Sequence, residues 1–395
     1  MRSTNFSKLY LPEHEPASRS GVADPPPLLQ TLASAAGIVF NGSRPWDIQV
    51  RDTALYRRVM TQGSLGFGEA YMDGLWESAR LDETMTRLIR ANHDHRLGGL
   101  ALLRMALTVL QHQLLNLQSR RRAFEVGKRH YDIGNDLYAA MLDSSMSYSC
   151  AYWKNADDLE TAQRQKLDLI CRKLQLRPGE RLLDIGCGWG GLAEHAARHY
   201  GVEVVGITIS EQQSKLAQTR CRGLPVEIRL QDYRQLKGRF DKLVSVGMFE
   251  HVGPKNYATF FQVASRVMDE QGLMLLHTIG TRTTSRSGDP WINRYIFPNG
   301  ILPSARQITQ AVEPGFVIED WHNFGPDYDR TLMAWWQNFN AAWQSMDKSR
   351  YDRRFYRMWK YYLHACAGFF RARDGQLWQL VLSRPQRRGI YRSLR

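Results

Sequence analysis

The segment LLDIGCGWGG (182–191) combines an acidic residue with three closely spaced glycines. An apolar run delivers Asp184, and Gly186, Gly188 and Gly190 follow at alternate positions. Glycine permits a tight turn in which the backbone approaches a ligand closely, and open α/β sheets bind small molecules where their strands end. The G-x-G-x-G spacing departs from the G-x-G-x-x-G pattern of dinucleotide-binding proteins. The segment therefore predicts a small-molecule site that is not of the dinucleotide type.

Two further ionisable residues lie at or just after the ends of predicted strands later in the chain. Glu250 lies in SVGMFEHVG (245–253), and His277 lies in LLHTIG (275–280). If these strands are central neighbours, both side chains arise at the same carboxyl edge of the sheet as Asp184. Two ionisable groups at such an edge are more often functional than structural, and a structural ion pair is the alternative.

The glycine segment resembles motif I of S-adenosylmethionine-dependent methyltransferases. In that family an acidic residue and a glycine loop hold the methionine part of the cofactor. The resemblance implies that Asp184, Gly186, Gly188 and Gly190 bind S-adenosylmethionine. A purely structural glycine turn is the alternative, but strand, acid and three glycines occur together here.

The next strand ends in GITISEQQ (206–213), where Ser210 is placed to cap a helix and Gln213 stands three residues later. This spacing is a capping-box pattern. Many methyltransferases carry an acidic residue at this strand end to bind the ribose, whereas this chain has Thr208. We expect Thr208 and Gln213 beside the cofactor and the ribose contact elsewhere.

The third strand ends in QDYR (231–234). Asp232 could form a hydrogen bond with the adenine ring of the cofactor, and Tyr233 could contact the ring. A surface turn is the alternative interpretation of this short segment.

The elements that must position these residues alternate between strand and helix from about residue 165 onward. The strand-like runs are Arg181–Ile185, Val202–Thr208, Val226–Leu230, Lys242–Val246 and Leu273–His277. Such alternation predicts an α/β fold with a doubly wound, mainly parallel sheet. Two later runs, Gly315–Trp321 and Leu377–Leu382, would complete a Rossmann-like methyltransferase sheet of seven strands.

The N-terminal part is predicted to be mainly helical over residues 28–117. Its turn signals are Asn41-Gly42, Gly63, Gly66 and Gly68. We therefore expect a smaller, mainly helical domain over residues 1–120 and a catalytic methyltransferase domain over residues 121–395.

The stretch Leu97–Leu117 is rich in leucine but interrupted by Arg104 and His112, and three arginines follow it. It could lie on a membrane as an amphipathic helix. Packing inside the N-terminal domain is the alternative.

Basic residues outnumber acidic ones, and the formal net charge is +14. Such a charge favours a polyanionic partner, either nucleic acid or an anionic lipid surface. Residues 348–395 hold 13 Lys or Arg against 2 Asp and are rich in aromatic side chains. This mixture suits a membrane interface or stacked bases, and a solvated helix face with a packed inner side is the alternative.

The 5 cysteines form no C-x-x-C pair and no metal-like cluster. Neither a disulfide framework nor a zinc site is therefore expected, and a reducing cytoplasm is the natural compartment. The first residues lack the apolar core of a signal peptide, and no apolar window reaches the roughly 18 residues of a membrane span. We expect a protein that is neither exported nor membrane-spanning.

The motifs together resemble one family, the bacterial cyclopropane-fatty-acyl-phospholipid synthases. The matching segments are SLGFGEAYMDGLWE (64–77), YSCAYW (148–153), LLDIGCGWGG, GITISEQQ, GMFEHVGPKNY (247–257), LLHTIG, DPWINRYIFPNGILPS (289–304), DWHNFGPDYDRTLMAWW (320–336) and ACAGFFRARDGQLWQLVLSR (365–384). They run through nearly the whole chain, which is far more specific than a lone methyltransferase motif.

The resemblance implies a reaction. Synthases of this family transfer the sulfonium-bound methyl of S-adenosylmethionine to a cis double bond of an acyl chain in a membrane phospholipid, and then close a cyclopropane ring. An alkene has no proton to remove beforehand, so the enzyme must align it with the methyl and keep water from the cation that forms. A base must then take a proton from the new methyl group.

In this family the base is a bound bicarbonate. The resemblance assigns its site to Cys150, Glu250, His277 and Tyr328, with backbone near Ile279. Glu250 can accept the hydrogen bond from the bicarbonate O–H, while His277, Tyr328 and backbone N–H groups can donate to its oxygens.

The segment SMSYSCAYW (145–153) would then cross the cofactor site, with Tyr148 and Ser149 toward the cofactor and Cys150 toward the anion. No thiol-dependent step is needed, so Cys150 is not expected to be a nucleophile. A buried cysteine that behaves as a small apolar residue, or that offers only its backbone N–H, is the alternative.

The resemblance also implies an unsaturated phospholipid substrate at an anionic membrane surface, on which the N-terminal domain (1–120) and the basic C-terminal end would dock. It further implies peripheral association with the inner membrane from the cytoplasmic side, a homodimer, and no nucleic acid as partner. A nucleic-acid methyltransferase is an alternative, but the N-P-P-Y motif that amino-methyltransferases commonly carry after the fourth strand is absent. Methyl addition to the alkene without ring closure is a second possible function, and lipid binding without catalysis is a third.

Overall fold

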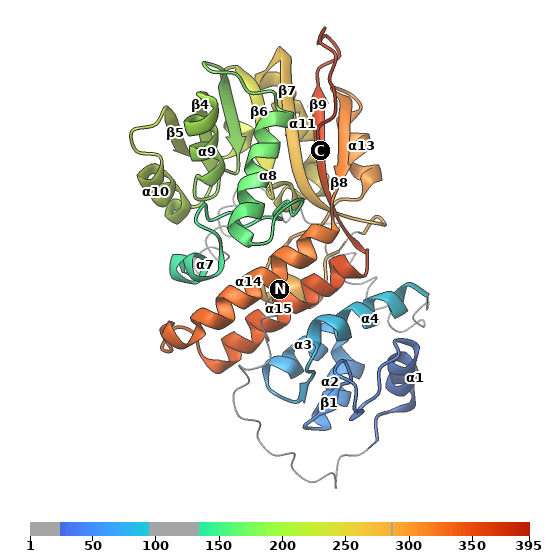
Figure 1. Ribbon diagram of the computed structural model, residues 1–395. Coiled ribbons are helices and arrows are strands. Elements are labelled where there is room, and N and C mark those ends of the chain that lie inside the picture. Colours follow the sequence, from blue (N-terminus) through green and yellow to red (C-terminus); the bar gives the residue numbers. More distant parts are fainter. Residues whose placement is uncertain (1–23, 95–133, 286) are drawn as a thin grey trace, which may run out of the picture.

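The computed structural model describes residues 24–94, 134–285 and 287–395 (Figure 1). The strands of its main sheet are β3 Arg181–Ile185, β4 Glu203–Thr208, β5 Val226–Leu230, β6 Phe240–Val246, β7 Met268–Thr281, β8 Val317–Asn323 and β9 Gly375–Ser383. Each of the seven strands predicted from the sequence is present, with shifts confined to the strand ends.

The strand order of this sheet is β5-β4-β3-β6-β7-β9-β8. Neighbours from β5 to β7 pair in parallel, and β9 runs antiparallel to both β7 and β8. The chain goes from β3 to β4 on one side and later returns to β6 on the other side of β3. This reversal is the topological switch point at which open α/β sheets bind ligands, so the prediction of a doubly wound, mainly parallel sheet is confirmed.

Helices cover both faces of the sheet because successive strand residues point to opposite sides. On one face, Leu183 packs in the same core as α11 (Tyr257–Val267) and α13 (Ala305–Val312). On the other face, Leu182 packs with α8 (Leu159–Lys173) and α9 (Gly191–Tyr200). The remaining helices of this part are α7 Asn135–Met141, α10 Glu211–Arg220, α12 Pro290–Tyr295 and the short 3-10 helices η1 Tyr233–Gln235, η2 Phe249–His251, η3 Pro254–Asn256 and η4 Trp343–Ser345.

The described N-terminal part is helical, as predicted. It contains α1 Pro27–Ala35, α2 Ala54–Gln62, α3 Ser64–Met72 and α4 Leu81–Asp94, with a small antiparallel sheet of β1 Gln49–Val50 and β2 Trp76–Glu77. Gly63 separates α2 from α3 at φ +58°, so the turn predicted there is confirmed.

The turns predicted at Gly66 and Gly68 are wrong, because both residues lie inside α3. A Cβ at Gly68 would lie 2.4 Å from the Trp291 ring, and one at Gly66 would lie 2.3 Å from the Arg58 carbonyl oxygen. These glycines therefore permit close packing of the helix rather than a turn.

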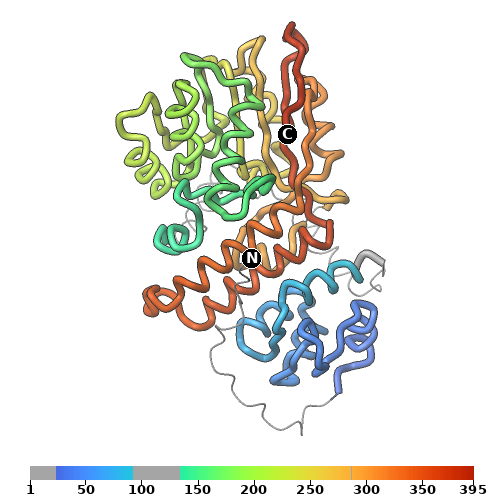
Figure 2. Tube along the Cα trace, viewed as in Figure 1, coloured from blue at the N-terminus to red at the C-terminus, as the bar shows by residue number. Residues whose placement is uncertain are grey.

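A hairpin of α14 (Pro326–Ala342) and α15 (Arg353–Arg371) lies between the sheet and the N-terminal helices (Figures 1 and 2). Arg357 of α15 is 8% exposed and donates to the carbonyl oxygens of Tyr71 and Trp76. Arg371 pairs with Asp329 of α14 and with Asp82 of α4. Part of the basic C-terminal segment therefore holds the two halves of the molecule together instead of facing solvent.

The predicted domain boundary at residue 120 and the stretch Leu97–Leu117 lie outside the described residues. No helix within residues 24–94, 134–285 and 287–395 is long and apolar enough to cross a membrane.

Candidate functional site

The glycine loop after β3 has the geometry that its sequence predicts. Gly186, Gly188 and Gly190 have φ values of +90°, +54° and +84°, which favour glycine. The Gly186 N–H donates to the Ile207 carbonyl oxygen of β4 at 3.0 Å. A Cβ at Gly188 would meet only open space. The loop therefore bends away from the sheet at the switch point and leaves room beside its backbone.

Asp184, at the start of this turn, is 2% exposed, and its Oδ2 has no hydrogen-bond partner among the described residues. Burial raises the pKa of this carboxyl to about 7, and the positive charge of Lys166 opposes the shift. A buried carboxylate oxygen without a donor is costly, so the carboxylate is suited to receive a cationic or hydrogen-bonding ligand.

The end of β4 brings Thr208 and Gln213 together. The Thr208 hydroxyl donates to Gln213 Oε1 at 2.9 Å, and Ser210 Oγ accepts from the Gln213 N–H at 3.3 Å. The helix cap at Ser210 is confirmed. The Gln213 side chain instead forms its hydrogen bond with Thr208. The helix therefore has the cap bond from Ser210 but not the reciprocal bond of a capping box, and Thr208 and Gln213 form a buried polar pair beside the glycine loop.

The polar residues at the end of β5 bond to neighbouring residues of the same segment. Asp232 caps η1, and its two carboxylate oxygens accept from Arg234 at 2.9 and 2.6 Å. The Tyr233 ring packs edge-on against Phe260, with centroids 5.4 Å apart. The adenine contacts expected of Asp232 and Tyr233 stay predictions.

Glu250 and His277 lie near the ends of neighbouring strands, because Val246, the last residue of β6, pairs with His277 of β7. Glu250 follows in η2, and its Oε1 accepts from the Ile279 N–H at 2.7 Å. Its Oε2 is buried and has no partner among the described residues. Burial raises the pKa of Glu250 to about 7.

The His277 imidazole is 1% exposed, and burial holds its pKa well below the usual value. Its Nδ1 lies 3.2 Å from the amide nitrogen of Gln379, which is a donor. With this amide nitrogen as donor to Nδ1, the ring proton would sit on Nε2, an atom that has no partner in the part of the chain that the structure describes. The alternative of a structural Glu250–His277 ion pair is not what the structure shows.

The segment 145–153 crosses the end of β6 and is fastened to α14. A Cβ on Gly247, directly after β6, would lie 3.8 Å from the Ser149 Cβ. The Ala151 N–H donates to Thr331 Oγ1 at 3.1 Å, and the Trp153 N–H donates to Asp327 Oδ2 at 2.8 Å. These bonds place the segment beside both the switch point and the first turns of α14.

Of the predicted site residues in this segment, Ser149 and Cys150 are buried and Tyr148 is partly buried. The hydroxyls of Tyr148 and Tyr362 are 2.8 Å apart, and Ser149 Oγ accepts from Lys166 Nζ at 3.0 Å. Cys150 is fully buried, and burial raises the pKa of its thiol well above the usual value. A protonated thiol agrees with the expectation that Cys150 is not a nucleophile.

Tyr328 of α14 stacks on Phe370, with ring centroids 4.5 Å apart, and its hydroxyl makes no hydrogen bond to any described residue. Burial raises the pKa of this hydroxyl. Cys150 and Tyr328 belong to one core cluster, Ile279 packs against it, and Glu250 accepts from the Ile279 N–H. The structure therefore brings Cys150, Glu250 and Tyr328 into one buried region.

Several residues of this region were not identified from the sequence. Gln163 and Lys166 of α8 hold the segment 145–153 from one side, and Asp327 and Thr331 of α14 hold it from the other. One signal was present: Lys166 falls on the apolar stripe of α8, where a surface lysine is not expected.

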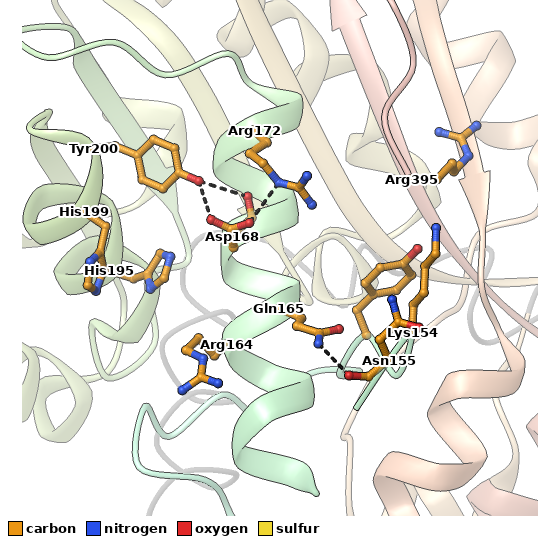
Figure 3. Close-up of a pocket in the computed structure, with 11 residues that line it drawn as sticks. Lys154, Asn155, Arg164, Gln165, Asp168, Arg172, His195, His199, Tyr200 and Arg395 are labelled. Carbon is orange, nitrogen blue, oxygen red and sulfur yellow. Dashed lines mark hydrogen bonds and ion pairs between the residues drawn. The ribbon is translucent and has the colours of Figure 1, made fainter. Parts of the chain in front are cut away.

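An open groove of about 790 Å³ lies elsewhere, over the outer side of α8 (Figure 3). Basic side chains line it, among them Lys154, Arg164 and Arg172, but none of the predicted site residues does. Asp168 in this groove pairs with Arg172 and accepts from Tyr200. The buried switch point, rather than this groove, is therefore the candidate site.

Several known proteins are similar to this chain in sequence, and several solved structures are similar to it in fold. The cyclopropane-fatty-acyl-phospholipid synthase of Escherichia coli strain K12 is 58% identical over 359 residues, which cover 91% of this chain and 93% of the relative. A probable fatty acid methyltransferase of Pseudomonas putida is 33% identical and covers 91% of this chain and 88% of the relative.

Among solved structures, the cyclopropane synthase MmaA2 of Mycobacterium tuberculosis superimposes with a TM-score of 0.63 at 32% identity, covering 66% of this chain and 98% of that one. The mycolic acid cyclopropane synthase CmaA1, complexed with SAH and CTAB, superimposes with a TM-score of 0.61 at 32% identity, covering 66% of this chain and 97% of that one. The family model for mycolic acid cyclopropane synthetase matches residues 118–380. The chain therefore belongs to the mycolic acid cyclopropane synthetase family of S-adenosylmethionine-dependent methyltransferases.

Proposed function

We propose that this enzyme forms cyclopropane rings on unsaturated acyl chains of membrane phospholipids, with S-adenosylmethionine as methylene donor and bicarbonate as base. The name of the E. coli relative, which is 58% identical to this chain, supports the substrate class. The observation that carries the mechanism is the set of buried polar atoms without partners at the switch point: Asp184 Oδ2, Glu250 Oε2 and His277 Nε2.

The residues present fit S-adenosylmethionine. The unpartnered Asp184 carboxylate oxygen can accept from the amino group of a methionine moiety, and the open space beside Gly188 lets backbone approach it. When bound, this cofactor supplies an electrophilic methyl group on a sulfonium sulfur. Ser149 and Tyr148 close the site from the segment above it.

The residues present also fit a small planar anion that carries one proton. Glu250 Oε2 can accept that proton in a hydrogen bond, while His277 Nε2–H and the Tyr328 hydroxyl can donate to the other oxygens. Bicarbonate at this position would supply the base for ring closure. Glu250 then holds the anion in the orientation that leaves an oxygen free to take the proton.

Aromatic side chains at this edge can exclude water from the cation that the alkene forms. The Tyr148 ring lies with its centroid 5.2 Å from Trp335 and 6.4 Å from Phe297, and Tyr328 lies 6.0 Å from Trp335. Ring faces also attract positive charge. Such walls favour ring closure over capture of the cation by water.

Contact with an anionic membrane surface is part of the proposal. Arg353 at the start of α15 and Arg388 and Arg392 after β9 remain exposed, and Ile390, between the last two in the sequence, is 88% exposed. Each such charge near an anionic surface contributes about 1 kcal/mol. Peripheral association with the inner membrane on the cytoplasmic side and a homodimer stay predictions from the family resemblance.

The test is a product analysis. Purified protein is incubated with S-adenosylmethionine and liposomes of a cis-monounsaturated phospholipid, with and without bicarbonate, and acyl chains are analysed by mass spectrometry. We expect each product chain to gain one CH₂ and lose its double bond, with less product when bicarbonate is depleted. A methyl-branched product, or methyl transfer to RNA in place of lipid, would overturn the proposal.

A further inference from the structure

Helix α8 presents two buried polar side chains, one turn apart, to the segment 145–153. Gln163 Nε2 donates to the carbonyl oxygens of Ser147 at 3.2 Å and Ser149 at 2.9 Å. Lys166 Nζ donates to Ser149 Oγ at 3.0 Å. Gln163 is 0% exposed and Lys166 is 1% exposed. Three hydrogen bonds from one helix therefore fix the backbone and the hydroxyl of Ser149 together.

Burying the Lys166 ammonium group costs free energy. No carboxylate lies within ion-pair distance of its ammonium group in the described structure, and a buried charge without a close partner is costly. The carboxylates that act on it at longer range are those of Asp143 and Asp184. An apolar side chain would fill the same stripe of α8 at lower cost, so the charge serves something other than packing.

Ser149 and Asp184 both lie at the proposed cofactor site. Ser149 lies over Gly247 at the end of β6, and Asp184 lies at the end of β3, its neighbour in the sheet. We propose that Lys166 is a positioning residue for S-adenosylmethionine, which acts by fixing the Ser149 hydroxyl beside the cofactor. The inference rests on the proposed cofactor site.

The test measures binding of S-adenosylmethionine to the full chain by calorimetry, comparing Lys166→Met with Lys173→Met. Lys173 is a matched control, because it lies on α8 two turns later, is also buried, and pairs with Asp320 at 3.1 Å. Loss of a charged hydrogen bond predicts that Lys166→Met raises the Kd at least about tenfold. Lys173→Met is expected to lower the melting temperature at least as much and to leave the Kd within about threefold.

Two results would overturn the role of Lys166: an unchanged Kd in a folded Lys166→Met protein, or equal losses of affinity in both variants. A wild-type chain that fails to bind S-adenosylmethionine would instead overturn the cofactor site itself, so the two failures are distinguishable.

A double-mutant cycle shows whether Lys166 acts through Ser149. If it does, Ser149→Ala costs affinity alone but adds less than about threefold when Lys166→Met is already present. Fully additive losses would contradict this coupling, since the side chains would then contribute independently.

Discussion

Helix α8 buries two lysines, and their surroundings differ. Lys173 Nζ lies 3.1 Å from Asp320 Oδ2 and 3.2 Å from His322 Nδ1. Asp320 also accepts from both Arg395 and Ser393. Lys166, two turns earlier, has only the Ser149 hydroxyl within hydrogen-bond distance among the described residues. One cluster is saturated with partners, and the other is not.

The difference in pairing distinguishes buried polar groups that stabilise the fold from those that bind ligands. Buried polar groups in proteins are nearly always paired, because an unpaired one costs free energy. Asp184 and Glu250 are the only described carboxylates with a fully buried oxygen that lacks a partner, and both lie at the switch point of the sheet. We infer that the saturated cluster around Asp320 stabilises the fold, whereas the unpartnered carboxylates of Asp184 and Glu250 bind ligands.

The largest expected effect is on turnover in Glu250→Gln. Replacing the carboxylate oxygen by an amide donor removes the acceptor for the anion, so we expect ring formation to fall about 1000-fold with cofactor affinity nearly unchanged. Product analysis and calorimetry measure the two quantities. The control is Glu227→Gln, an exposed carboxylate paired with Arg229 on β5, which should behave like the wild type. Retention of ring formation in Glu250→Gln would show that the unpartnered oxygen is not a site.

A smaller effect is expected for Asp184→Asn, on cofactor affinity. We expect the Kd for S-adenosylmethionine to rise about 100-fold, because a charge-assisted hydrogen bond is lost.

The same substitution should change stability. The pKa of Asp184 is about 7 in the folded chain against an ordinary value of 3.8, so the cost of its ionisation to stability grows between these pH values and is complete above pH 7. Asparagine should therefore raise the free energy of unfolding at pH 8 by about 1 kcal/mol or more. Lower stability together with unchanged affinity would be the opposite of this account.

The pH dependence of binding should be weaker still. The cationic cofactor favours ionised Asp184, whose pKa without ligand is about 7, so binding releases a proton below that pH. We expect the Kd to fall by up to about tenfold per pH unit toward pH 7 and then to level off. Calorimetry in two buffers of different ionisation enthalpy measures the proton release. The Asp184→Asn protein should show none, and equal release by both proteins would assign the proton to another group.

The smallest effect on function is expected for Asp320→Asn. The substitution leaves Lys173 buried without its carboxylate, which costs about 3 kcal/mol of stability. Denaturant unfolding should show this loss, while the Kd for S-adenosylmethionine stays within about twofold of the wild type below the unfolding transition. A large change in Kd would mean that the saturated cluster also serves the ligand site.

The strands and the glycine loop could be predicted from the sequence because their signals are local. Runs of apolar residues mark each strand, and Gly186, Gly188 and Gly190 adopt the positive φ values that only a glycine-rich turn tolerates readily. Glu250 and His277 could be placed at one edge because the ends of parallel neighbours coincide.

Tertiary contacts decided what the sequence left open. Gly68 signals a turn by residue type, yet it serves to admit the Trp291 ring against α3. Arg357 adds to the basic charge of the C-terminal segment, yet its guanidinium is buried against Tyr71 and Trp76. Lys166 contacts Ser149, which lies 17 residues earlier in the chain. Residue type and spacing carry no information about such pairings until the fold is known.

A structure determined with S-adenosylhomocysteine and bicarbonate would test the central claim most directly. The account predicts the methionine moiety against Asp184 and the glycine loop, and the anion within hydrogen-bond distance of Glu250 Oε2, His277 Nε2 and the Tyr328 hydroxyl. An anion bound in the basic groove over α8, with the atoms at the switch point still unpartnered, would contradict it.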